Sequence, residues 1–551
     1  MKANSLKRFN RCFAVALLVW LWAGQAYSQE MNPQVTLLDS LNRLKQGAMP
    51  DREQALEQLG EVNHPRTLTV LQALLNGKLY QVASNEQLVI AAENSEGYQL
   101  IDAITGEDLG NKPRSDVNKI NLTNTIRVKL RKLIGQLELK SEDATVRLAA
   151  VNGLIKATDD NTLALLRQLE TTERDEAVLE AMQMIFALKD LKSEDKAIRL
   201  TALVTLKDFN NQEVVNRLNV LMEKDSAGQY LETDADVRKQ AKLILSEINA
   251  RIQFYSILET LFFGLSLGAV LVLAAIGLAI TFGVMGVINM AHGELMMLGA
   301  YTTYVIQQMM PDHLGLSIVM AIPAAFLISG LVGIAIERGI IRFLYGRPLE
   351  TLLATFGVSL FLQQTVRSIF SPLNRSVTTP EWMSGSLQIN DFLSLTWNRF
   401  YILVFCLMVF VLLLQILKRT RLGLEVRAVA QNRGMAKVMG IPTDKVDAMT
   451  FGLGSGIAGV AGVALSQITN VGPNLGQAYI VDSFMVVVFG GVGNLWGTLV
   501  AGFSLGIANK ILEPYAGAVL AKILVLVFII LFIQKRPSGL FPQKGRAVEA
   551  K

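Results

Sequence analysis

Three polar side chains, Asn289, His292 and Glu294, lie within six positions of one another in an otherwise apolar stretch, residues 280–304. Polar groups at membrane depth are costly and are usually retained where they face a cavity, a pore or each other. Asn offers both a donor and an acceptor, and His and Glu also form hydrogen bonds with polar solutes. We therefore expect these residues to line a solute path. The alternative is that each only joins two helices by a hydrogen bond.

The spacing of these residues suggests how they are arranged. We expect Asn289 and His292 to share one helix face, because residues three apart are neighbours on a helix, and Glu294 to lie on another face. Gly286 and Gly293 permit close helix contacts or a broken helix, whose freed backbone groups must line a cavity or be covered by protein. We include both glycines in the predicted path.

A second glycine-rich segment, FGGVGNLWG at residues 489–497, resembles FGVMGVIN at residues 282–289. Gly491, Gly493 and Asn494 are therefore added to the predicted path. Paired interruptions in two halves of a transporter indicate a site near the bilayer midplane. We expect Asp482 and Ser483 to cap the half-helix before this second segment.

Composition divides the chain into two parts. The 551 residues are 51% hydrophobic, but residues before 251 are charged and helix-forming, whereas residues after 255 form long apolar runs. We predict a soluble domain at 29–250 and an α-helical polytopic membrane domain at 251–542. The net charge of +5 reflects membrane topology and does not indicate a nucleic-acid partner. With no metal cluster or nucleophile–base set in the sequence, we expect no enzymatic activity, metal or cofactor.

The N-terminus has the pattern of a signal peptide, which we assign to residues 1–28. Four basic residues precede the apolar run 12–23, and Ala26 and Ser28 supply the small residues of a cleavage site. The alternative is an uncleaved first transmembrane helix. If cleavage occurs, only Cys406 remains, so no internal disulfide can form.

The soluble domain contains an internal repeat. LKSEDATVRLAAVNGL begins at Leu139 and LKSEDKAIRLTALVTL at Leu191, and DADVRKQAKLIL gives a third copy of the Asp-x-x-Val-Arg start. Such starts, each followed by an apolar-striped helix, resemble HEAT-like repeats. Short apolar runs near 78–110 predict a small β-hairpin insert. The domain is either a docking surface for a partner or a structural extension.

The membrane domain is expected to cross the bilayer nine times. Basic residues concentrate in loops 338–347 and 418–447 and in the tail, and such loops are cytoplasmic. The signal peptide puts the soluble domain outside and the 543–551 tail inside. The expected spans are 257–281, 285–309, 315–337, 351–371, 400–417, 448–469, 478–493, 494–511 and 517–534.

The basic loop 421–446 is amphipathic and too polar to insert into a membrane. We interpret it as a short coupling helix that docks onto a motor subunit and passes rigid-body motion to the spans on either side. The alternative is a solvated loop. The predicted coupling residues are Glu425, Arg427, Ala428, Asn432, Ala436, Gly440 and Ile441.

Several of these segments resemble a known family. GLAITFGVMGVINMAHGELMMLGAY, EVRAVAQNRGMAKVMGI, FGGVGNLWGTLVAG and the terminal RPSGLF resemble the LivH-type permeases of branched-chain amino acid ABC importers, over residues 256–542. Within that family, the chain is most similar to the urea permeases of the UrtB type, because of its long N-terminal extension and the residues GVMGVINMAHGELMMLGAY of the first motif. The resemblance implies a type II ABC importer fold, a bacterial inner-membrane location, a second, LivM-like permease, two ATPase subunits and an extracytoplasmic binding protein.

The sequence has no GxxxxGK[ST] motif, so ATP that drives transport must bind another chain. We expect alternating access, with urea as the solute. Branched-chain amino acids or short amides remain alternative solutes. A passive polar-solute channel is another possibility, but it leaves the basic loop unexplained. A membrane-anchored sensor would need a cytoplasmic signalling domain, for which the tail is too short.

Overall fold

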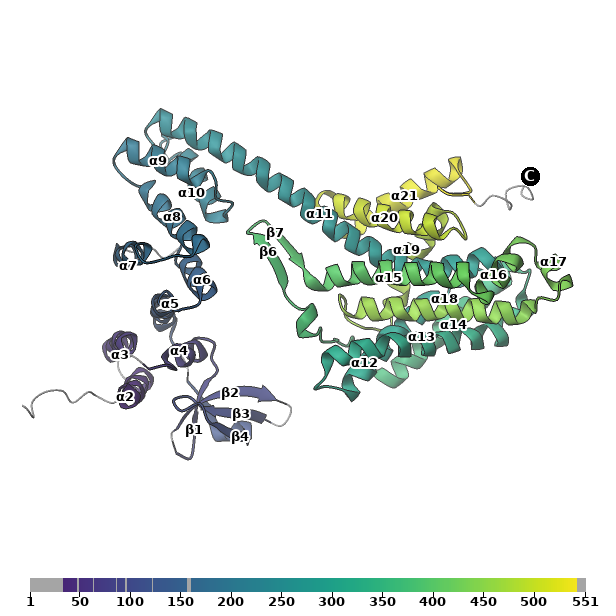
Figure 1. Cartoon of the computed structure of the whole chain (residues 1–551), viewed down its shortest axis with the longest axis horizontal. Coiled ribbons are helices and arrows are strands. Elements are labelled where there is room, and N and C mark those ends of the chain that lie inside the picture. The colour runs from purple at the N-terminus through teal and green to yellow at the C-terminus, as the bar shows by residue number, and fades with distance from the viewer. Residues whose placement is uncertain are drawn as a thin grey trace, which may run out of the picture. The chain divides into compact units, whose positions relative to one another are not determined.

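The computed structural model describes residues 33–46, 49–62, 64–85, 87–94, 97–120, 122–155 and 160–542. The predicted signal peptide and the 543–551 tail lie outside the described residues. By its contacts the chain divides into two compact units (Figure 1), the first extending to residue 245 without 210–212 and the second comprising 210–212 and the residues from 246 onward. The division falls inside one long helix, α11 (Ala235–Met285).

The first unit is mainly helical, with a core of leucine and isoleucine side chains. Leu37, Leu59, Leu71, Ile126 and Leu130 are all fully buried in one hydrophobic cluster. The helices, which pack their apolar stripes into such clusters, are α2 (Pro33–Gln46), α3 (Met49–Glu61), α4 (Thr67–Leu75), α5 (Asn124–Glu138), α6 (Ala144–Leu154), α7 (Asp160–Glu170), α8 (Glu176–Asp190), α9 (Lys196–Leu206) and α10 (Gln212–Met222).

The predicted β-hairpin near 78–110 is instead a five-stranded antiparallel sheet that extends to Lys119. Its order is β4-β3-β2-β1-β5, so the last strand returns to pair with the first. That strand has three residues, of which only Val117 is buried, so its composition gave no strand signal. The strands are β1 (Leu79–Val82), β2 (Leu88–Asn94), β3 (Gly97–Asp102), β4 (Asp108–Lys112) and β5 (Val117–Lys119).

The sequence repeat has a local structural counterpart. Asp143 and Asp195 each cap a helix by accepting a hydrogen bond from a backbone N–H two residues ahead, at 2.8 Å in both copies. Arg147 then donates to the Ser141 carbonyl in the preceding loop, and Arg199 donates to the Ser193 carbonyl, again at 2.8 Å in both. The conserved start of each copy therefore fixes the same turn into a helix.

The second unit is a bundle of helices with one hairpin, β6 (Ser386–Asn390) and β7 (Leu393–Thr396). In Figure 1 the hairpin and the α16–α17 segment lie at opposite ends of this bundle. After α11 the helices are α12 (His292–Met309), α13 (Leu314–Gly339), α14 (Pro348–Phe370), α15 (Trp397–Arg419), α16 (Arg421–Gln431), α17 (Arg433–Val438), α18 (Thr443–Ser466), α19 (Leu475–Gly490), α20 (Leu495–Ala516) and α21 (Ala518–Lys535).

Each of the nine predicted spans overlaps a helix, but only six of the described helices are long and apolar enough to cross a membrane. These are α11, α13, α15, α18, α20 and α21. Helix α19 has only 16 residues. Helices α12 and α14, with 18 and 23 residues, fall outside the set although they are long enough, because both carry several polar side chains.

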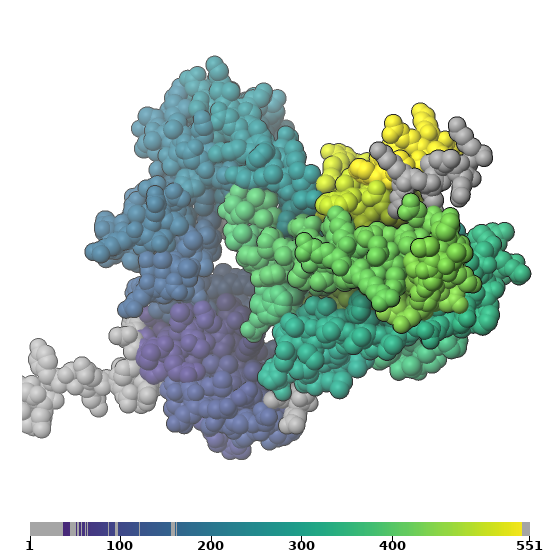
Figure 2. Space-filling view, turned by 45° about the vertical axis from the view of Figure 1, so that its right-hand side comes forward, coloured from purple at the N-terminus to yellow at the C-terminus, as the bar shows by residue number. Residues whose placement is uncertain are grey.

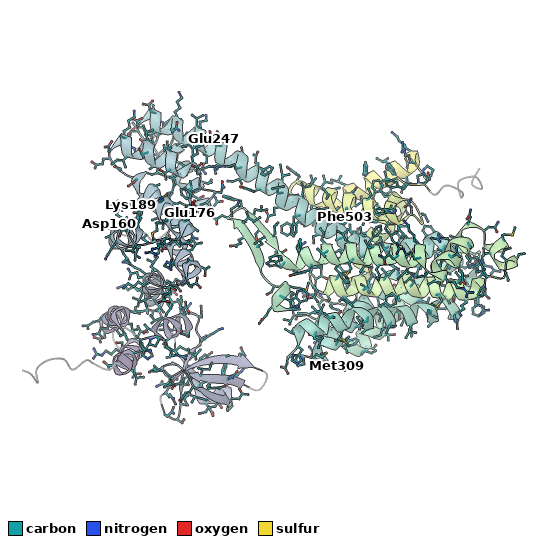
Figure 3. The ribbon with its side chains drawn as sticks, viewed as in Figure 1. Asp160, Glu176, Lys189, Glu247, Met309 and Phe503 are labelled. Carbon is teal, nitrogen blue, oxygen red and sulfur yellow. The ribbon has the colours of Figure 1, made fainter. Side chains whose placement is uncertain are left out.

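Helix α18 lies at the centre of the bundle, and 94% of its most apolar 18-residue stretch is buried inside the structure. Its glycines allow neighbouring backbones to touch. A Cβ on Gly454 would lie 2.6 Å from the Gly277 carbonyl oxygen of α11. A Cβ on Gly299 of α12 would lie 2.0 Å from the Gly459 carbonyl oxygen of α18. Helix α20 approaches α11 in the same way, since a Cβ on Gly268 would lie 2.7 Å from the Cα of Phe503, which Figure 3 labels. Small residues are what permits such close approach in membrane bundles.

Candidate functional site

The chain breaks between α11 and α12, within the predicted path. Helix α11 ends at Met285, Gly286 follows at φ +67°, and α12 begins only at His292. Asn289 lies in this non-helical segment, where its Oδ1 accepts a hydrogen bond from the Ala291 backbone N–H at 3.0 Å. The prediction that Asn289 and His292 share one helix face, and that the span runs from residue 285, was therefore wrong. The left-handed glycine ends one helix before the next begins.

His292 and Glu294 are both buried, but they contact different helices. His292 is fully buried, and its Nε2 lies 2.8 Å from the Ala274 carbonyl oxygen of α11. Glu294 is 1% exposed, and its Oε1 accepts hydrogen bonds from α14. The prediction that these two side chains lie on different faces agrees with the contacts, so they do not form one cluster.

Helix α14 carries polar residues that the sequence analysis missed. Ser359 Oγ and Gln363 Nε2 donate to Glu294 Oε1 at 3.1 and 2.7 Å. Thr355 Oγ1 accepts from the backbone N–H of Met290, in the break, at 3.1 Å. The signal that could have found them is polar residues repeated every fourth position in an otherwise apolar helix, TLLATFGVSLFLQ from Thr351 to Gln363.

Each of the three polar side chains near the break retains one buried atom that has no hydrogen-bond partner among the described residues. The atoms are Nδ2 of Asn289, Nδ1 of His292 and Oε2 of Glu294. Leaving a buried polar group unsatisfied costs about 1–3 kcal/mol, so most such groups in proteins are paired. These three atoms mark the break as a place with unused hydrogen-bonding capacity.

The second glycine-rich segment is also a helix break. Helix α19 ends at Gly490, Gly491 and Gly493 adopt φ +103° and +79°, and Asn494 Oδ1 caps α20 by accepting from the Gly497 N–H at 3.1 Å. The prediction that Asp482 and Ser483 cap a half-helix was wrong, because both lie inside α19. Asp482 instead pairs with Lys522 of α21 at 2.9 Å, and Ser483 Oγ donates to the Tyr479 carbonyl at 2.8 Å.

The two breaks touch each other. A Cβ on Gly283, in the last turn of α11, would lie 2.4 Å from the Cα of Gly493. The first turns of α12 and α19 meet in the same way, with a Cβ on Gly293 lying 2.4 Å from the Gly476 carbonyl oxygen. The terminal segment 536–541 closes the second break, since the Leu540 N–H donates to the Phe489 carbonyl at 2.9 Å. The two similar sequence segments therefore form one continuous region of interrupted helices.

The predicted coupling loop folds into two short helices. Thr420 caps α16, and Asn432 caps α17 by accepting from the Met435 N–H at 2.9 Å. Gly440, at φ +85°, ends the segment. Glu425 pairs with Arg421 at 2.9 Å, and Arg427 Nη1 donates to the Leu417 carbonyl at 2.8 Å. Of the remaining predicted residues, Ala436 is buried, whereas Ala428 and Ile441 are half-buried.

The exposed part of this segment is more apolar than its sequence suggested. Four side chains of α16, α17 and the following turn are more than half exposed: Leu424, Met435, Val438 and Met439. In Figure 2 the light-green residues that include these helices form part of the outer surface of the second unit. We call these four residues the apolar patch. Exposed apolar patches commonly mark surfaces for partners.

Both predicted basic loops lie at the same end of the bundle. Arg433 of α17 donates to Asp447 of α18, and its guanidinium lies 3.9 Å from the ring centroid of Tyr345, which belongs to the other loop. Arg342 and Asp444 form a second link at 3.4 Å. The two loops are therefore one connected surface.

An apolar cavity of about 220 Å³ lies elsewhere, between α13, α15 and α18. Its walls include Ile318, Trp382, Tyr401, Val463 and Gln467, and none of the predicted path residues lines it. In the part of the chain that the structure describes, no group of three or more His, Cys, Asp or Glu side chains is arranged to hold a metal ion.

Comparison with known proteins identifies the second unit. Residues 260–533 match the model of the family described as branched-chain amino acid transport system / permease component. The high-affinity branched-chain amino acid transport system permease protein LivH of Escherichia coli is 32% identical over 304 residues, and LivH of Salmonella typhimurium is 31% identical over 299 residues. BraD of Pseudomonas aeruginosa, a permease of the same description, is 29% identical over 297 residues.

Each of these three alignments covers 96% of the relative but only 52% of this chain. The first unit lies outside residues 260–533, which the family model matches. No solved structure shows a significant match. Relatives above 30% identity are matched over nearly their whole length, so the chain belongs to the branched-chain amino acid transport permease family, as a multi-pass membrane subunit of an ABC importer that works with ATPase and substrate-binding partners.

Proposed function

We propose that this chain is a urea-translocating permease subunit of an ATP-driven importer in the bacterial inner membrane. The observation that carries the proposal is the pair of touching helix breaks, beside which Asn289, His292 and Glu294 each keep one polar atom that has no partner in the described part of the chain. Urea is small, uncharged and rich in donors and acceptors. A path for it needs hydrogen-bonding groups of both kinds, and among the described residues the Nδ2 donor of Asn289 and the Oε2 acceptor of Glu294 are without a partner.

The proposed mechanism is alternating access, driven from the end of the bundle that carries the apolar patch. ATPase subunits dock on α16 and α17, and their closure pushes this segment. The link from Arg433 to Asp447 passes the motion into α18, whose glycines pack against the backbones of α11, α12 and α13, so these four helices move together relative to α14. ATP is used by the partner subunits, and this chain needs no cofactor of its own.

The proposed assembly contains a second, LivM-like permease, two ATPase subunits and an extracytoplasmic binding protein. The two basic loops form one surface, which supports a common cytoplasmic location. The C-terminus then lies inside, and the first unit lies in the periplasm, where its helical repeats serve as a docking surface for a partner.

Branched-chain amino acids are the second candidate solute, and the relatives favour them. Uptake of labelled urea and labelled leucine, in cells that lack and then regain this gene, tests both. We expect urea uptake to depend on the gene and leucine uptake to be unchanged. Gene-dependent leucine uptake without urea uptake would refute the assignment of urea.

A further inference from the structure

Helix α14 presents its polar side chains inward and its apolar side chains outward. Thr351, Thr355, Ser359 and Gln363 recur at every fourth position, and each is at most 4% exposed. On the other faces of the helix, Leu353 and Phe361 are about 70% exposed. Apolar side chains on the outside of a membrane bundle can face lipid, but four buried polar side chains need polar partners inside the protein.

That counterpart is the break before α12 and the first turn of α12. Thr355 bonds the Met290 N–H, and Ser359 and Gln363 share one oxygen of Glu294. Glu294 Oε2 and Asn289 Nδ2 have no partner among the residues described. Thr351 instead donates to the carbonyls of Leu344 and Arg347. The residues that contact the counterpart therefore run from Thr355 to Gln363, eight positions or about 12 Å at 1.5 Å per residue. We call this α14 face, with residues 288–294, the polar seam.

We propose that the polar seam is the route of the solute along this subunit, and that its hydroxyl and amide groups select a small uncharged amide. This inference rests on the proposed function. Hydroxyls and amides both donate and accept, so they can exchange hydrogen bonds with a diamide at successive levels. A branched aliphatic side chain would leave the same buried groups unpaired, which is an effective means of rejecting a solute.

The seam also explains why α14 has few close backbone contacts. Its inward face meets the break and α12 through the side chains of Thr355, Ser359 and Gln363, whereas the glycines of α18 bring that helix into backbone contact with α11, α12 and α13. The seam is closed here by side-chain hydrogen bonds, which a solute can replace one at a time. Backbone contacts between glycines cannot be replaced in that way.

Thiol labelling during turnover tests the route. The only cysteines, Cys12 and Cys406, are first replaced by Ser and Ala. Ser359→Cys and Thr355→Cys are then made in the assembled importer, and labelling by a small polar methanethiosulfonate is followed with binding protein and ATP, with and without urea. Ser329→Cys is the matched control, because Ser329 is also fully buried and bonds the Leu295 carbonyl, but from α13.

We expect Ser359→Cys and Thr355→Cys to react during turnover, urea to slow both reactions severalfold, and Ser329→Cys to stay unreactive. The route is refuted if both seam cysteines are as inert as Ser329→Cys, or if urea leaves their labelling rates unchanged. Two conservative variants give a second readout: Thr355→Val and Gln363→Met should each lower urea uptake about tenfold, because one hydrogen bond of the path is lost, whereas Ser329→Ala should not.

Uptake by the unmodified importer separates this inference from the proposed function. Urea import together with inert seam cysteines refutes the seam alone. Import of leucine without urea refutes the proposed function and removes the solute class assigned to the seam.

Discussion

Replacing Arg433 by Ala should loosen the attachment of the coupling helices to the bundle. In the native chain Nη1 of Arg433 donates to Asp447 Oδ1 at 2.9 Å, and Nη2 donates to the other carboxylate oxygen. The Asp447 side chain is only 3% exposed, whereas that of Arg433 is 30% exposed. Removing one partner of a buried pair costs about 3–5 kcal/mol. Because Arg433 is partly solvated, we expect about 2–3 kcal/mol here.

The assay is thermal unfolding of the full-length chain in detergent, followed by hydrogen–deuterium exchange. At about 2–4 °C per kcal/mol, Arg433→Ala should lower Tm by about 4–12 °C, and exchange should rise in α17 and in the first turn of α18. Lys437→Ala is the matched control, since Lys437 is an exposed cation on the same short helix. The double variant Arg433→Met, Asp447→Leu should recover most of the loss, because no buried charge is left unpaired.

Arg433 does not hold the coupling helices to the bundle if Arg433→Ala unfolds at the temperature of the Lys437→Ala control, or if the double variant is less stable than Arg433→Ala. In the assembled importer the same substitution should reduce solute uptake more than ATP hydrolysis, because the motor can still turn over while its motion reaches α18 less effectively. Equal losses of both would show that this link does not transmit motion.

Three other variants test the glycine contacts, the proposed path and the helical repeats. Gly293→Ala places a methyl group 2.4 Å from the Gly476 carbonyl oxygen, so it should destabilise the chain by about 1–3 kcal/mol. Gly153→Ala is the control and should not destabilise it, because a Cβ at Gly153 would meet nothing within 4 Å. Thermal unfolding of the two variants measures the difference. Asn289→Leu should abolish urea uptake in an importer that still assembles, and uptake at the unmodified rate would exclude a lining role. The hydrogen bond from Arg147 lowers the pKa of Glu173 from 4.5 to about 2. The stabilisation from this pair is therefore complete above pH 4.5 and is lost as pH falls towards 2, and Glu173→Gln should flatten that pH dependence of hydrogen exchange in α6 and α8.

Much of the helix layout could be predicted because six of the predicted spans are long apolar runs. The division into a charged and an apolar part and the repeat starts at Asp143 and Asp195 were equally readable, since composition and capping residues act locally. The β-sheet was underestimated because β5 is short and polar and gains its place only by pairing with β1.

The site was harder to predict than the fold. Asn289, His292 and Glu294 were singled out by their polarity, but their arrangement was not predicted, because a left-handed Gly286 ends one helix inside the apolar stretch. The seam partners Ser359 and Gln363 lie about 65–69 positions away in the chain and meet Glu294 only through tertiary packing. The apolar patch was missed because its members stand among charged residues such as Arg427, Arg433 and Lys437, and their exposure is set only when α16 and α17 fold.

The glycine contacts of α18 have a mechanical consequence. Helices that meet backbone to backbone at glycines move as one rigid body, because a shift of one residue would bring a side chain into a clash with the facing main chain. We therefore expect α11, α12, α13 and α18 to move together. Helix α14 is held instead by the side-chain hydrogen bonds of Thr355, Ser359 and Gln363. We therefore expect α14 to be the helix that moves relative to this rigid body.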